Sequence, residues 1–211
     1  MDAPPHASKA KLLGAALQVI RTKGYTATTV DDICAHAGVT KGSFFHHFRG
    51  KHDLALAAVE HWNTMTGELF ARAPYRRIAD PRDRLLAYID FRAELLRGEL
   101  PDFTCLLGTL VQETFDTHPQ IRDACNAGIA RHAHLVAEDL AAAKALYVPR
   151  AKWQPEAVGY FTQAVIQGAF ILAKAQGSAQ VAARCIDQLR GYLDGLLSPA
   201  TRSSTAKERT K

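Results

Sequence analysis

The amino-acid sequence predicts an all-α protein of about nine helices. Along most of its 211 residues, apolar side chains recur three, four and seven positions apart, which is the period of an amphipathic helix. Breaker residues such as Gly24, Gly98, Pro119 and Pro149 separate these segments. No segment alternates apolar and polar residues as a strand does, and no Asn-Gly pair marks a hairpin.

Size and composition favour a soluble, cytoplasmic protein of one or two domains. Of the residues 47% are hydrophobic, but no run approaches the roughly 20 apolar residues of a membrane span. The start of the chain lacks the basic and apolar regions of a signal peptide, so we expect no membrane association. The four cysteines form no C-x-x-C pair, which favours reduced thiols and no zinc site.

The net charge of +5 lies at the two ends of the chain. Residues 1–60 carry seven Lys and Arg against five Asp and Glu, and residues 198–211 carry four against one. The middle of the chain, residues 61–197, is balanced at fifteen of each. An excess of two charges is too small to indicate nucleic acid by itself, although it agrees with phosphate attraction.

The N-terminal segment predicts a flexible arm over residues 1–7 and a first helix over residues 8–23. The helix opens at Ser8, and its apolar stripe contains Leu12, Ala16, Val19 and Ile20. A basic residue followed by Gly24 is a typical helix end. This stripe is expected to cover the back of the two helices that follow.

Residues 29–54 predict a helix-turn-helix. Thr29 and Asp32 form the capping signature of a first helix, and Gly38 provides the left-handed residue that ends it. Thr40 then caps a second helix, in which Phe44 and Phe48 lie on one face because they are four residues apart. The opposite face carries small, basic and hydrogen-bonding side chains, as a recognition helix does.

This stretch resembles the DNA-binding domain of TetR-family transcriptional regulators. The residues that fit the family pattern, all at the expected spacing, are Thr29, Ile33, Ala37, Gly38, Val39, Thr40, Gly42, His47, Phe48, Lys51 and Leu54. Two positions depart from it. Cys34 replaces the usual alanine, and Phe45 replaces the usual tyrosine and so lacks the hydroxyl that would bind a phosphate.

The resemblance implies the DNA contacts position by position. Phosphate contacts are expected from Thr29, Thr40, Lys41, His47 and Lys51. Gly42 would allow close backbone approach, Ser43 and His46 would face the base edges, and Phe45 would offer apolar contact, for instance to a thymine methyl group. Because phosphate contacts position a protein without specifying sequence, the operator cannot be read from this set.

The remaining chain predicts a larger helical domain. We place the DNA-binding domain at residues 8–52, a ligand-binding and dimerisation domain at 53–197, and a disordered basic tail at 198–211. A long helix over 53–72 is followed by a loop over 73–81 and by helices over 82–97, 104–116, 119–145, 155–176 and 178–197. In this fold the long helix bridges the two domains.

The last two helices predict packing surfaces of small and apolar residues. One carries Phe161, Val165, Gly168, Ala169 and Leu172, and the other carries Ile186, Leu189, Leu193 and Leu196 near a heptad spacing. Both stripes are also compatible with an internal core. The resemblance favours a homodimer in which these helices form a four-helix bundle with their symmetry mates and space two recognition helices for a palindrome.

A ligand cavity is expected in the second domain. Its candidate lining residues are Trp62, Phe103, Cys105, Phe115, Phe170 and also Tyr160, although aromatic residues at such spacings also occur in plain cores. The segment around Cys105 resembles one that some family members use to sense electrophiles, and a thiol at a helix N-terminus is more reactive. The alternative is a small buried apolar residue.

No metal site, cofactor or catalytic motif is indicated. His46 and His47 are adjacent and His132 and His134 are two apart, so neither pair has the i, i+4 spacing of a helical metal site. We expect no enzyme but a repressor that a small hydrophobic or electrophilic ligand releases from a palindromic operator. A ligand-independent regulator or activator, and a helical enzyme or protein-binding module, remain alternatives; replacing Lys41 and His47 by alanine would leave the last class unaffected.

Overall fold

The computed structural model describes residues 5–198, and all regular secondary structure in this range is helical. The helices are α1 (Pro5–Lys23), α2 (Val30–Ala37), α3 (Lys41–His47), α4 (Lys51–Arg72), α5 (Pro81–Glu94), α6 (Leu100–Phe103), α7 (Leu106–Thr114), α8 (Pro119–Tyr147), α9 (Pro155–Gln176) and α10 (Gln180–Leu196). A short 3₁₀ helix, η1 (Pro74–Arg77), lies between α4 and α5. This part of the chain contains no strand, so the predicted all-α fold is confirmed.

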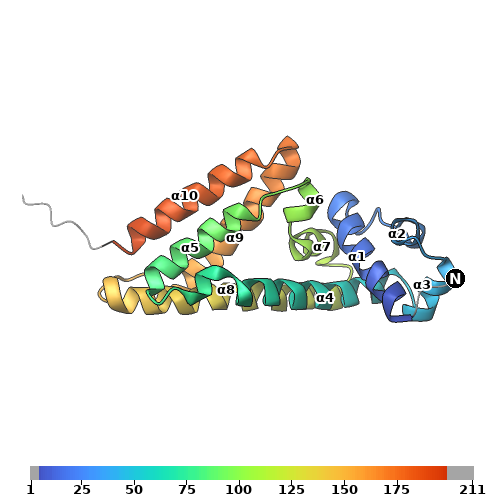
Figure 1. Ribbon diagram of the computed structural model, residues 1–211, viewed down its shortest axis with the longest axis horizontal. Helices are drawn as coiled ribbons and strands as arrows, with labels where there is room; N and C mark the ends of the chain where they lie inside the picture. Colours follow the sequence, from blue (N-terminus) through green and yellow to red (C-terminus); the bar gives the residue numbers. More distant parts are fainter. Residues whose placement is uncertain (1–4, 199–211) are drawn as a thin grey trace, which may run out of the picture.

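The molecule is elongated, with α1–α3 at one end (Figure 1). The long helices α4 and α8 run along its length, α5, α9 and α10 gather at the other end, and α6 and α7 lie between the two groups. Helix α1 begins at Pro5 rather than at Ser8, so residues 5–7, predicted as part of a flexible arm, are helical. Residues 1–4 and the predicted tail beyond Ser198 lie outside the described part.

The core of the N-terminal helices continues into the second half of the chain. Leu12 of α1, Ile33 of α2 and Phe44 of α3 are fully buried together. The same cluster includes Leu110 of α7 and Ile121 of α8, both also at 0% exposure. The predicted boundary between residues 52 and 53 is therefore not a break in packing.

Two helix assignments differ from the sequence-based prediction. The helix expected over 104–116 begins only at Leu106, as α7, because Thr104 and Cys105 have extended backbones, and the short helix α6 precedes these two residues. The expected loop over 73–81 contains the 3₁₀ turn η1. The later start places Cys105 directly before the first residue of α7.

The heptad-like stripe of α10 packs inside its own protomer. Ile186, Leu189 and Leu193 are 1%, 2% and 0% exposed, and they contact the core that α5, α8 and α9 share. The stripe therefore belongs to the internal core, which was one of its two interpretations, and a four-helix bundle with the symmetry mates stays a prediction for the outer faces of these helices. Heptad spacing makes one face of a helix apolar without identifying the helix that covers it.

None of the described helices combines the length and the hydrophobicity needed to cross a lipid bilayer.

Candidate nucleic-acid interface and ligand cavity

The start and end of α2 are fixed by the predicted local signals. The Thr29 hydroxyl accepts a 3.1 Å hydrogen bond from the Asp32 amide, and the Asp32 carboxylate accepts a 2.8 Å bond from the Thr29 amide. Gly38 has a φ of 63°, in the left-handed region that glycine adopts without strain. Hydrogen bonds from Lys23 and Thr29 lower the pKa of the half-buried Asp32 carboxyl well below its ordinary value.

Helix α3 is held by one face and leaves the other open. The Thr40 hydroxyl caps it by accepting a 3.2 Å hydrogen bond from the Ser43 amide. Phe44 and Phe48 are 0% and 3% exposed, whereas Phe45 between them is 58% exposed. Packing of the buried pair therefore sets the angle at which the outer face is presented.

The predicted DNA-contacting residues differ in exposure. Thr29, Thr40, Lys41, Gly42, Phe45 and His46 are exposed, and Ser43, His47 and Lys51 are half-buried. Lys41 pairs with Asp31 at 2.8 Å, but both side chains are more than 60% exposed and the pair is open to exchange with a phosphate. A Cβ at Gly42 would meet only Thr40 Oγ1, at an ordinary 3.7 Å, so the fold itself does not require glycine there.

Two residues expected to bind phosphate already have partners within the protein. His47 Nε2 lies 2.7 Å from Ser8 Oγ on α1. The Lys51 ammonium donates to the carbonyls of Tyr25, Thr26 and Thr28 at 2.9–3.3 Å and lies over the Tyr25 ring. Since an ammonium has three donors, Lys51 must release at least one carbonyl to bind a phosphate, and this contact stays a prediction.

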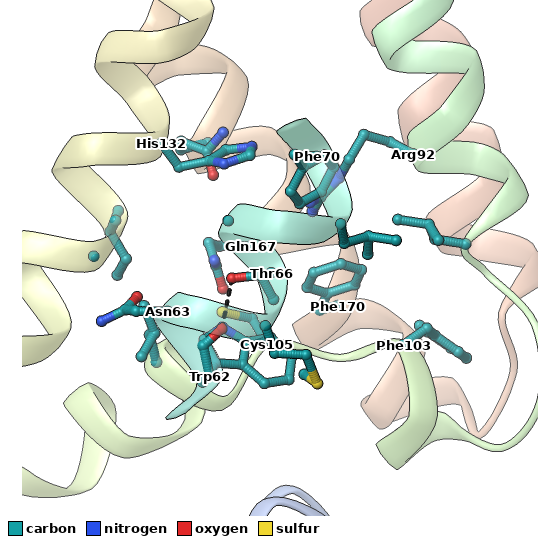
Figure 2. Close-up of a pocket in the computed structure, with 18 of the residues that line it drawn as sticks. Trp62, Asn63, Thr66, Phe70, Arg92, Phe103, Cys105, His132, Gln167 and Phe170 are labelled. Atoms are coloured by element: carbon teal, nitrogen blue, oxygen red, sulfur yellow. Dashed lines mark hydrogen bonds between the residues drawn. The ribbon is translucent and has the colours of Figure 1, made fainter. Parts of the chain in front are cut away.

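A cavity of about 420 Å³ lies where α1, α4, α5, α8 and α9 meet the α6–α7 segment (Figure 2). Four of the predicted lining residues surround it, namely Trp62, Phe103, Cys105 and Phe170. Phe115 does not, because it lies one residue past the buried Thr114, rotated by about 100° from the apolar stripe of α7, and is 61% exposed. Tyr160 is also outside the cavity, 45% exposed and against His134.

Cys105 is half-buried at the junction of two cavities. Besides the first, it lines a neighbouring cavity of about 240 Å³ that also includes Thr109 and Lys174. The Lys174 ammonium donates a 3.0 Å hydrogen bond to Thr109 Oγ1, and burial lowers its pKa. Cys105 is thus not sealed in a core, although reactivity towards electrophiles stays a prediction.

One end of the large cavity is polar. Figure 2 shows His132 from α8 and Arg92 from α5 on either side of Phe70, with Trp62 and Cys105 at the opposite end of the cavity. His132 Nε2 lies 2.9 Å from the Tyr88 hydroxyl. Burial, and then the charges of Arg92, Arg76 and Arg131, lower the pKa of His132 to about 3, so the imidazole is neutral at pH 7.

Neutral His132 is expected to make the protein less stable in mild acid. Between its ordinary pKa of 6.5 and about 3 the unfolded chain binds a proton that the folded chain does not, so stability falls as pH falls. The free energy of unfolding should drop by roughly 2 kcal/mol between pH 6.5 and 5 through this group alone. Urea titrations at both pH values measure the drop.

His132→Gln should lose most of that pH dependence, and His36→Gln, at an exposed position, should keep it. If the free energy of unfolding changed equally with pH in wild type and His132→Gln, His132 would have to be protonated in the folded protein as readily as in the unfolded chain.

Arg21 connects α1 to the cavity and was not found from the sequence. Its guanidinium donates to the carbonyls of Asp102 and Thr104 at 3.3 and 3.2 Å, and its own helix accepts at Leu17. It lies 5.0 Å from the Trp62 ring centroid, lines the cavity and is 8% exposed. In the sequence it looks like an ordinary basic residue in the last turn of a helix.

Among residues 5–198, no three His, Cys, Asp or Glu side chains gather as potential metal ligands. The four cysteines are all free.

Two family models match the chain. One, described as bacterial regulatory proteins of the tetR family, matches residues 12–58. The other, described as the tetracyclin repressor-like C-terminal domain, matches residues 81–189. Together they cover the recognition helix and most of the cavity.

Curated relatives are transcriptional regulators. AcuR of Cereibacter sphaeroides is 36% identical over 111 residues, which is 52% of this chain and 51% of the relative. CymR of Pseudomonas putida is 31% identical over 133 residues, which is 63% of each chain. The chain thus spans about half to two thirds of the length of these relatives.

Solved structures agree over more of the chain. A regulatory protein TetR from Rhodobacter sphaeroides has a TM-score of 0.77 at 27% identity, covering 87% of this chain and 97% of that one. The reduced form of Escherichia coli NemR has a TM-score of 0.75 and covers 92% and 100%, but at 22% identity this likeness concerns the fold alone.

Proposed function

The chain belongs to the TetR family of bacterial regulatory proteins, and from that we propose that it is a homodimeric repressor released from a palindromic operator by a small ligand. The observation that carries the proposal is the pairing of an open recognition face on α3 with a cavity that α1 also lines. Membership of a family of DNA-binding regulators favours a regulator over an enzyme.

The recognition face has the chemistry to read DNA. Lys41 and Thr40 lie at the start of α3, where basic and hydroxyl groups bind phosphate. His46 and Phe45 are exposed one turn farther on, and this exposure supports the proposal that they contact bases in the major groove. The room beside Gly42 supports close approach of the backbone to DNA.

Release by a ligand requires that the ligand prefer a state in which the recognition helices are wrongly placed. Arg21 supports such coupling, because one guanidinium touches Trp62 in the cavity and binds the chain between α6 and α7. A hydrophobic ligand that moves Trp62, or an adduct on the neighbouring Cys105, would disturb these bonds and with them α1. A population shift from mostly bound to mostly free requires a difference in ligand affinity of about 10⁴-fold.

Dimerisation is proposed through the outer face of α9 and α10. Phe161, Val165, Val181 and Tyr192 line an apolar groove of about 500 Å³ there, and Phe161 and Tyr192 are 44% and 46% exposed with rings 5.0 Å apart. Apolar patches of this kind are typical of association surfaces. A Cβ added at Gly168 on the same helix would meet no described atom within 4 Å, which leaves room for a second helix.

Tyr192→Asp is expected to convert the dimer into a monomer, because twofold symmetry would bring two carboxylates into a mainly apolar groove in which Arg184 is the single lining cation from each protomer. Light scattering at micromolar concentration measures the mass. Leu146→Asp is the control, since Leu146 is 63% exposed on α8 and does not line the groove. A wild-type monomer, or an unchanged dimer in Tyr192→Asp, would contradict this interface.

The proposed function is tested by footprinting the purified protein on the DNA upstream of its own gene. A protected palindrome, weakening steeply as salt rises, is expected because phosphate contacts release counterions. Equal affinity for random and upstream duplexes would refute sequence-specific repression. Protection that no ligand relieves would instead favour a ligand-independent regulator.

A further inference from the structure

The polar end of the large cavity carries positive charge without a matching carboxylate. Arg92 lies 5.2 and 5.8 Å from the ring centroids of Phe70 and Phe170, and it makes no hydrogen bond or ion pair with any residue in the described range 5–198. Arg131 of α8 lines the same cavity and is likewise without a carboxylate partner there. Among the described residues, the only acidic one in the lining, Asp102, already accepts bonds from Glu99 N and Gln18.

A buried amide at this cavity lacks a hydrogen-bond acceptor. Gln163 of α9 is 5% exposed and lines the cavity, and its Nε2 has no partner among the described residues. The Tyr88 hydroxyl, bonded to His132 at 2.9 Å, lies close enough to the Gln163 side chain to interact with it, but Gln163 Nε2 does not meet the geometry of a hydrogen bond with any described atom. A buried donor left without an acceptor is costly, so an acceptor supplied by a ligand would remove that cost.

The neighbouring groups do not neutralise the charge. Arg76 is paired with Asp139 at 3.3 Å, which leaves Arg92 and Arg131 as the unpaired cations near His132 within the described part of the chain. Burial and these cations keep the imidazole neutral, so it adds no further positive charge and no negative charge. This end of the cavity therefore carries positive charge that no described carboxylate neutralises.

The rest of the cavity is apolar. Phe103 and Phe170 contact one another at 6.1 Å between ring centroids, and Trp62 closes the far end. A volume of about 420 Å³ suits a small organic molecule. A ligand that fits both regions has an apolar body and one anionic end.

We propose that the effector is an amphipathic monocarboxylate, with its carboxylate on Arg92 and Gln163 and its apolar body against Phe103 and Trp62. A carboxylate matches a guanidinium in planarity and can bind it through two parallel hydrogen bonds. A neutral hydrophobic ligand would instead seal Arg92 and Gln163 away from water without partners. This inference rests on the proposed function and specifies the chemical class of its ligand.

The test measures direct binding without DNA. Octanoate and 4-phenylbutyrate are titrated calorimetrically into the full-length protein, each beside its primary amide, which has nearly the same shape and no charge. At least one acid is expected to bind ten or more times tighter than its amide. Arg92→Gln should lower the affinity for that acid at least tenfold and change the affinity for the amide less than twofold.

Two further variants serve as controls, one for the loss of a distant positive charge and one for the loss of folding. Arg97→Gln, at an exposed arginine outside the cavity, should bind as wild type does. Gln163→Leu removes the buried unpaired amide, so it should fold at least as well as wild type and still bind the acid several-fold more weakly.

The inference is overturned if no acid is preferred over its amide, or if Arg92→Gln and Gln163→Leu both retain the preference. Operator binding by ligand-free wild type is measured separately. If the protein binds its operator but shows no preference for an acid, only the proposed ligand class is refuted. If it binds no operator, the proposed function is refuted, and the calorimetry still tests the ligand class.

Discussion

Phe44→Ala is expected to lower the free energy of unfolding by about 3–5 kcal/mol and to abolish operator binding, because the lost ring leaves a cavity in the core that holds α3 against α1 and α2. Phe44 is 0% exposed, lies 5.8 Å from the Phe48 ring, and belongs to the cluster that joins α1, α2 and α3. A domain is stable by only about 5–15 kcal/mol, so this loss is a large share. Urea titration followed by circular dichroism measures it.

Phe45→Ala is the matched control, since the two residues are adjacent and of the same type. Phe45 is 58% exposed, and its replacement should change stability by no more than about 0.5 kcal/mol. Any loss of operator affinity in Phe45→Ala would then report a direct contact with DNA. Equal destabilisation by the two variants would mean that α3 is not anchored as the structure shows.

The helix-turn-helix was predictable because each of its signals is local. The Thr29–Asp32 capping pair, the left-handed Gly38 and the buried Phe44 and Phe48 depend on neighbours within four residues. Helical spacing then fixes which face is buried. The sequence therefore specified this element and its open face almost completely.

The cavity was predictable only in part. Arg21, Arg92, His132 and Gln163 come from four helices far apart in the chain, so no local pattern connects them. Aromatic character alone indicated Phe115, but the turn of α7 on which it lies places it in solvent. Residue type suggests burial, whereas only tertiary packing decides which buried surfaces line a cavity.

The same limit applies to the association of helices. Small residues on α9 predicted a close approach around Gly168, where the structure shows open space. The close approach inside the protomer is at Gly159, where an added Cβ would lie 2.5 Å from the Ala133 carbonyl oxygen of α8. Both glycines lie within α9, and nothing in the residues beside them shows which one is tightly packed. Only the position of α8 determines this.

Gly159→Ala is therefore expected to destabilise the protein by about 1–3 kcal/mol or more, because the methyl group meets rigid helix backbone and α8 and α9 must separate. The intrinsic helix preference of alanine acts in the opposite direction by roughly 0.5–1 kcal/mol, so the clash has to exceed this gain. Thermal unfolding, with its midpoint several degrees lower, measures the difference.

Gly67→Ala provides the comparison, because Gly67 lies within α4 with no atom within 4 Å of an added Cβ. Only the helix preference operates there, and this variant should gain about 0.5–1 kcal/mol. If Gly159→Ala gained as much as Gly67→Ala, α8 and α9 would have to lie farther apart than the structure places them. The wall of the cavity that both helices form, including His132 and Gln163, would then be displaced as well.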